Sequence, residues 1–270
     1  MSSDRWLPIS RLGLTVRRSA IVGFAAGAVA MGAWVVAMYP AVRGRPEFQD
    51  LLAKYPKEIL AFFGGAANLD ITSPTGYVRI ELLSFMAPVL MLVMAIGLGA
   101  HGVAGQEEQG TLELVLARPV SRWRVVAEQA LVVAAATGAV GAALLASLWV
   151  GTTATSMHVA VARLTAAAVA VTVLGFVYGM VALAVGAATG RRGTALGSAA
   201  ALAAAAYLLT SLSQLIAGLE PLRPLSPFSQ TVGLDPLGTG FHPLASLVMV
   251  GVGVAVGAAG ALAFERRDVR

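Results

Sequence analysis

The chain of 270 residues contains no cysteine and few charged residues. Without thiols it can form no disulfide, no thiolate metal site and no cysteine nucleophile. Only 12% of its residues are Asp, Glu, Lys or Arg, whereas a soluble domain carries about 25%. Because the chain is also 57% hydrophobic, we expect a polytopic membrane protein that is embedded in the lipid bilayer.

Catalytic and metal-binding patterns are missing as well. His101, His158 and His242 are far apart in the sequence, and there is no HExxH, GxSxG or phosphate-binding GxxxxGK[ST] motif. We therefore predict that the chain is not an enzyme and holds neither a metal nor a cofactor of its own. The formal charge of +5 does not indicate nucleic acid, because the basic residues gather at the ends of apolar runs, where they orient membrane helices.

Six apolar runs are each long enough to cross a hydrocarbon core of about 30 Å. They predict an all-α membrane protein with a single transmembrane domain over residues 1–270. The predicted spans are 20–40, 82–104, 125–150, 164–188, 194–218 and 243–264. Six spans place both termini on one side, and the basic residues favour cytoplasmic N- and C-termini, since 12 of the 19 Lys and Arg would then face the cytoplasm.

Three segments outside these runs have recognisable patterns. Residues 10–18 place Leu12 and Val16 opposite Arg18, which predicts a helix lying in the membrane interface. The outer loop 41–80 is expected to hold two short surface helices and then, at Ser73 and Pro74, the cap of the second span. Residues 219–243 contain five prolines, so an irregular re-entrant or interfacial segment is predicted there.

Polar residues near the outer ends of two spans are candidates for lining a transport path. They are Glu81 at the outer end of the second span, next to its first predicted residue, and Thr210, Ser211, Ser213 and Gln214 in the fifth span. Polar groups at membrane depth often serve a transport function, but they also form ion pairs and hydrogen bonds between helices. Glu81 has Arg79 two residues away, and Glu128 has Arg124 one turn away, so local pairing is the alternative for both.

The polar segment 105–124 lies between the second and third spans. Gly110 is expected to break the preceding helix, Thr111 to cap a new one, and Pro119 to end it after about two turns. Ser121 is then placed to cap the third span. The pattern predicts a short coupling helix held between two membrane helices, and an ordinary charged loop is the alternative.

The run Glu107-Glu-Gln-Gly-Thr-Leu-Glu-Leu-Val-Leu-Ala-Arg-Pro-Val-Ser-Arg122 resembles the E-x-G-T-L-E-x-L-L-x-x-P-x-S-R segment of permeases in the type-two ABC exporter superfamily. The resemblance, together with the six-span layout, covers essentially the whole chain. It implies a permease that works with a second permease copy, in a homodimer or a related heterodimer, and with a cytoplasmic ABC ATPase subunit that binds ATP and Mg²⁺. The residues it assigns to the ATPase interface are Glu107, Glu108, Gly110, Thr111, Glu113, Arg118, Pro119, Ser121 and Arg122.

The resemblance implies ATP-driven efflux across the plasma membrane of a bacterium, as in multidrug resistance. Because the spans contain few charges, a hydrophobic or amphiphilic cargo such as a drug, an antibiotic or a lipid is favoured over a highly charged one. Export of a lipid-linked glycan is the alternative within transport. A membrane anchor or assembly factor for a cytoplasmic ATPase, without transport of its own, is the alternative outside it.

Overall fold

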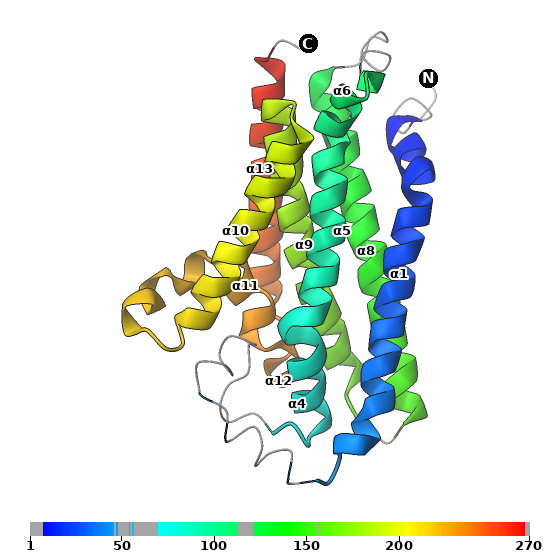
Figure 1. Ribbon diagram of the computed structural model, residues 1–270, viewed down its shortest axis with the longest axis vertical. Coiled ribbons are helices and arrows are strands. Elements are labelled where there is room, and N and C mark those ends of the chain that lie inside the picture. Colours follow the sequence, from blue (N-terminus) through cyan, green and yellow to red (C-terminus); the bar gives the residue numbers. More distant parts are fainter. Residues whose placement is uncertain are drawn as a thin grey trace.

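The computed structural model describes residues 8–45, 70–112, 121–155 and 157–267, together with Glu47, Lys54 and Pro56. All regular elements within these ranges are helical (Figure 1). The long helices are α1 (Pro8–Val42), α8 (Arg122–Ala154), α9 (Val161–Thr189), α10 (Arg192–Leu212) and α13 (Pro243–Glu265). The second span consists of α4 (Pro74–Val78), η2 (Arg79–Met86), α5 (Ala87–Ala100), η3 (His101–Gly105) and α6 (Gln106–Glu108).

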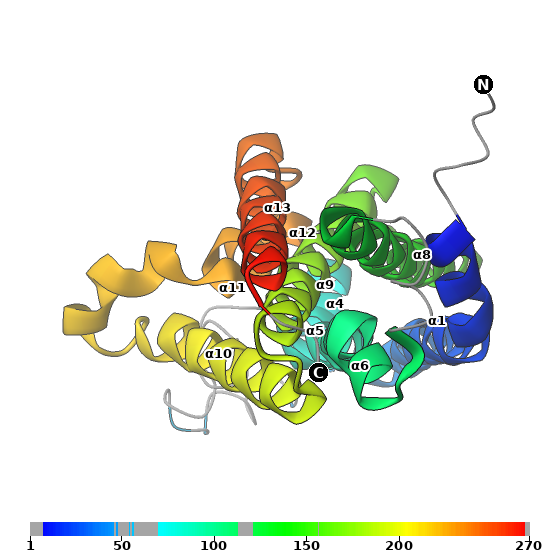
Figure 2. The ribbon, with the colours of Figure 1, turned by 90° about the horizontal axis from the view of Figure 1, so that it is seen from above.

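Helix α9 forms the centre of the bundle. It packs against α5, α8, α10 and α13, while α1 packs on α8 at one edge (Figures 1 and 2). The most apolar part of α9 is 72% buried, against 28% for α10 and 22% for α1. Six helices are long and apolar enough to cross a membrane, as predicted. Helix α10 ends at Leu212, earlier than the predicted 218, where the Ser213 hydroxyl donates to the Thr210 carbonyl at 2.9 Å.

The start of α1, the end of α13 and the short helix α6 lie at one end of the bundle (Figure 1). We call this the N/C end. The opposite end, which we call the loop end, carries α4 and the short helix α12 (Pro236–Thr239). The start of α1 and the end of α13 therefore lie at the same end of the bundle as residues 106–112, as an even number of spans requires.

The first helix differs from the prediction. Residues 10–18 are not a separate interfacial helix but belong to α1, a single helix of 35 residues. At a rise of 1.5 Å per residue it is about 52 Å long, so its first turns extend beyond a hydrocarbon core of about 30 Å. Helix α1 continues through Gly13 without interruption.

Most of the predicted outer loop lies outside the described residues, including the two surface helices expected after Pro46 and Pro56. The cap of the second span is confirmed, since the Ser73 hydroxyl accepts the Gly76 N–H at 3.2 Å and Pro74 is the first helical residue. The segment 219–243 is irregular, as predicted, up to Pro243, where α13 begins, and the irregular part already starts at 213, directly after α10. Its short helices are η4 (Ala217–Leu225), α11 (Pro227–Gln230), η5 (Val232–Leu234) and α12.

The second span contains two stretches of wide helix that the sequence did not predict. In η2 each backbone hydrogen bond reaches five residues back instead of four, as in the bond that the Ala87 N–H donates to Leu82 O. Pro88 follows directly and has no N–H to donate, so the regular α pattern cannot be satisfied at this turn. Such π segments often occur at functional sites, and η2 lines the cavity described below.

Gln129 in α8 provides a test of the packed core. Its side chain is 1% exposed, and neither end of its amide has a hydrogen-bond partner within the described part of the chain. A buried polar group without a partner costs about 1 to 3 kcal/mol. We expect Gln129→Leu to raise the unfolding temperature in detergent by roughly 2 to 10 °C.

Thr137→Val on the same helix is the matched control, because the buried Thr137 hydroxyl already bonds to the Val133 carbonyl at 2.9 Å. It should give no such gain. A lower unfolding temperature for Gln129→Leu than for the unaltered protein would show that the amide is satisfied in the folded state.

Candidate functional site

The segment expected to couple the permease to an ATPase begins at the N/C end. Helix α6 stops at Glu108, and Gly110 takes the left-handed conformation (φ 66°) with its N–H donating to Glu107 O at 3.0 Å. The predicted break at Gly110 is therefore confirmed. The Thr111 hydroxyl donates to Gln106 O at 3.0 Å, and the backbone groups that Thr111 was expected to cap lie among residues 113–120, outside the described ones.

Two carboxylates just before this turn bind other parts of the chain. Glu107 forms an ion pair with Arg267 beyond the end of α13, and the two side chains are 11% and 20% exposed. Glu108 accepts the backbone N–H of Arg192 at 2.8 Å, at the start of α10. The end of the second span is thus attached to the fifth and sixth spans at this level.

The far side of the segment is fixed in a similar way. Ser121 caps α8 as predicted, accepting the Arg124 N–H at 3.3 Å. Arg122 donates to the backbone carbonyls of Phe264, at 2.8 Å, and Arg267. These carbonyls lie in the last turn of α13 and just beyond it, where unpaired acceptors and the helix dipole favour a cation.

Glu107, Arg122, Phe264 and Arg267 form one cluster, which we call the α13 anchor. The guanidinium carbons of Arg122 and Arg267 lie 5.2 and 5.7 Å from the centre of the Phe264 ring, within cation–π range. Phe264 itself is fully buried. Both ends of the coupling segment are therefore held by the same few residues at the C-terminal end of α13.

The structure brings Glu107, Glu108 and Arg122 into contacts within the chain, and their contact with an ATPase remains a prediction. Gly110, Thr111 and Ser121 are exposed at the N/C end. Three further residues assigned to the interface, Glu113, Arg118 and Pro119, lie outside the described part of the chain. Arg267 and Phe264 were not predicted as site residues, because no sequence motif surrounds them near the C-terminal end of the chain.

A second candidate site is a cavity of about 90 Å³ at the loop end. Thr210, Ser211 and Gln214, which were predicted to line a path, line this cavity. Ser213 does not, because its hydroxyl turns back to Thr210 O. Glu81 does not line it either.

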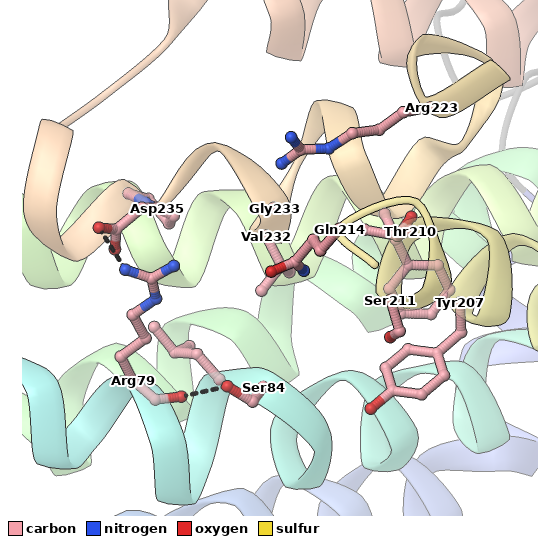
Figure 3. Close-up of a pocket in the computed structure, with 13 residues that line it drawn as sticks. Arg79, Ser84, Tyr207, Thr210, Ser211, Gln214, Arg223, Val232, Gly233 and Asp235 are labelled. Carbon is pink, nitrogen blue, oxygen red and sulfur yellow. Dashed lines mark hydrogen bonds and ion pairs between the residues drawn. The ribbon is translucent and has the colours of Figure 1, made fainter. Parts of the chain in front are cut away.

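Arg79 lines the cavity and pairs with Asp235 at 2.6 Å instead of with Glu81. Figure 3 shows this pair on one side of the cavity, with Gln214 and Arg223 extending over it. Asp235 also caps α12, accepting the Gly238 N–H at 3.2 Å from a left-handed conformation (φ 56°). An ion pair that bridges residues 156 apart in sequence thus ties the start of the second span to the irregular segment.

Hydroxyl groups fasten the irregular segment to α10. The buried Ser226 hydroxyl donates to Ala206 O at 2.8 Å and lies 2.7 Å from the Thr210 hydroxyl. Phe228 packs edge-on against Tyr207, with ring centres 5.4 Å apart. The cavity therefore has fixed walls contributed by η2, the end of α10 and the segment 223–236.

Comparison with known families identifies the chain's family. The family model described as an ABC-2 family transporter protein matches residues 29–269. No curated protein matches the chain. The family match extends from the middle of α1 past the end of α13 and includes both candidate sites. The chain therefore belongs to the ABC-2 family of membrane transporter permeases.

Proposed function

We propose that this chain is the permease subunit of an ATP-driven exporter in the plasma membrane of a bacterium. It would act with a second permease copy and a separate cytoplasmic ATPase, and ATP and Mg²⁺ would bind to the ATPase. This chain would provide the path for a hydrophobic or amphiphilic cargo. The distribution of basic residues supports a cytoplasmic position for the N/C end.

The observation that best supports coupling is the attachment of the segment 106–122 to spans other than its own. Glu107 and Arg122 bind the end of α13, and Glu108 binds the start of α10. A partner that displaced this segment would therefore act on four spans together. An ATPase with different affinities for two arrangements of these spans would shift the permease between them.

Gly110→Pro tests this proposal. Proline fixes φ near −65°, whereas Gly110 has φ 66°, so the chain must leave the turn in another direction. The variant permease is purified with the candidate ATPase and reconstituted in liposomes. We expect the ATP hydrolysis that the permease stimulates to fall at least about tenfold. A tenfold change corresponds to about 1.4 kcal/mol of coupling free energy.

Gly44→Pro is the matched control. Gly44 also has a left-handed φ (70°), and neither glycine has an atom within 4 Å of the position of an added Cβ. Gly44 lies beyond the opposite end of α1, so its variant should keep full stimulation. Unchanged stimulation in Gly110→Pro would refute the coupling role of the segment, and a permease that never binds the ATPase would favour the anchoring alternative.

A further inference from the structure

The polar cavity at the loop end adjoins an apolar groove. The groove has a volume of about 440 Å³ and runs between the second span and α10. Ser84, Tyr207 and Phe228 line both the cavity and the groove, so the two are adjacent and together offer a polar and an apolar part. The volume of the groove alone is within the range of small-molecule sites, about 300 to 1,000 Å³.

The polar part has an excess of positive charge. Its lining contains two guanidinium groups, Arg79 and Arg223, and one carboxylate, Asp235. Asp235 is already paired with Arg79, and among the described residues Arg223 forms no ion pair. Gln214 and the neighbouring hydroxyls add neutral hydrogen-bonding groups. Guanidinium groups favour phosphate and carboxylate oxygens because they can donate two parallel bonds.

The apolar part suits an extended chain. The residues that line it between Phe85 and Ile96 and between Leu196 and Ala204 are all aliphatic or aromatic. Its polar lining groups are the hydroxyls of Ser84 and Tyr207, which it shares with the cavity. From Ser84 to Ile96 the second span rises by roughly 18 Å at 1.5 Å per residue. Ala200 and Ala204 keep the α10 wall low, which leaves room for a ligand tail beside the helix.

We propose that the cargo is an amphiphile with an anionic head group, which binds with its phosphate or carboxylate at Arg223 and Arg79 and with its apolar tail in the groove. This inference rests on the proposed exporter function and narrows its cargo. The excess of positive charge in the cavity, directly beside the groove, favours this ligand over a neutral hydrophobic one.

Binding is tested with two fluorescent probes that have the same single acyl chain, lysophosphatidic acid and lysophosphatidylcholine. The permease is placed in nanodiscs of phosphatidylcholine, and the affinity for each probe is titrated. We expect the anionic probe to bind at least tenfold more tightly. Arg223→Gln should remove most of that preference, and Ala204→Phe should weaken both probes by filling the groove.

Two matched controls accompany these variants. Arg163→Gln removes an exposed arginine at the start of α9 that does not line the cavity, and Ala201→Phe adds the same ring to an exposed position of α10 outside the groove. Both should bind the probes as the unaltered protein does. Equal affinity for the two probes, or a preference that survives Arg223→Gln, would overturn the proposal.

Transport distinguishes a cargo from a lipid that merely resides in the site. In liposomes containing the permease and its ATPase, ATP should drive the anionic probe across the membrane, and Arg223→Gln should slow this several-fold without changing transport of the zwitterionic probe. Tight binding without ATP-driven movement of the anionic probe, while the zwitterionic probe is moved, would refute the anionic cargo and leave the exporter function standing. Movement of neither probe together with unstimulated ATP hydrolysis would count against the exporter function itself.

Discussion

Replacing Gly99 with alanine is expected to destabilise the bundle by about 3 kcal/mol or more, an overpacking penalty at the upper end of the usual range. A Cβ at this position would clash with the backbone carbonyl oxygen of Gly179 and would lie 3.0 Å from its carbonyl carbon. Neither atom can rotate away, because both belong to the backbone of the central helix α9. Helices α5 and α9 would have to separate, and the packing of α9 on its other neighbours would loosen with them.

Gly97→Ala on the same helix is the control, since nothing lies within 4 Å of the Cβ it would add. It should be neutral or stabilise the helix by up to about 1 kcal/mol. Thermal unfolding of the two purified variants in the same detergent gives the comparison. Equal unfolding temperatures for Gly99→Ala and the unaltered protein would mean that α5 and α9 do not approach each other so closely.

The glycines show what spacing in a sequence can and cannot predict. Glycines four residues apart suggest close helix packing, and the pattern occurs at Gly23 and Gly27, Gly175 and Gly179, Gly193 and Gly197, and Gly253 and Gly257. In the second and fourth pairs an added Cβ would clash with a neighbouring helix, whereas Gly23, Gly193 and Gly197 have no neighbour within 4 Å. Spacing identifies a helix face but cannot tell whether another helix packs there, and Gly99 belongs to none of these pairs.

The sequence predicted helix caps and helix breaks correctly where they depend on contacts within one helical turn. The caps at Ser73 and Ser121 and the break at Gly110 each depend on the nearest few residues. The ion pairs between distant segments were not predicted. Pairing with Glu81 was the alternative considered for Arg79, but Arg79 pairs with Asp235, because the partner of a charge at a helix end is determined by which helices meet there.

The second large effect is expected from reversing charges in the α13 anchor. Glu107→Arg would place two arginines together at a position that is only 11 to 20% exposed, and Arg267→Glu would place two carboxylates there. Breaking a shielded pair in this way should cost about 2 kcal/mol or more. We expect each single variant to lower the unfolding temperature and to reduce permease-stimulated ATP hydrolysis about tenfold, which corresponds to 1.4 kcal/mol.

Arg266→Glu is the control, because it makes the same charge change one residue earlier, at an exposed position for which the described residues provide no ion pair. It should leave both measurements near those of the unaltered protein. A loss as large as that of Arg267→Glu would show that net charge at the C-terminal end matters, and not the pair with Glu107.

The double variant, with arginine at 107 and glutamate at 267, separates two roles of Glu107. It restores an ion pair in reversed orientation but loses the stacking of Arg267 on the Phe264 ring, so we expect partial recovery of the unfolding temperature. If ATP hydrolysis recovers in parallel, Glu107 acts within the chain by holding the coupling segment to α13. If stability recovers while hydrolysis does not, Glu107 itself contacts the ATPase, since only the partner would still encounter the wrong charge.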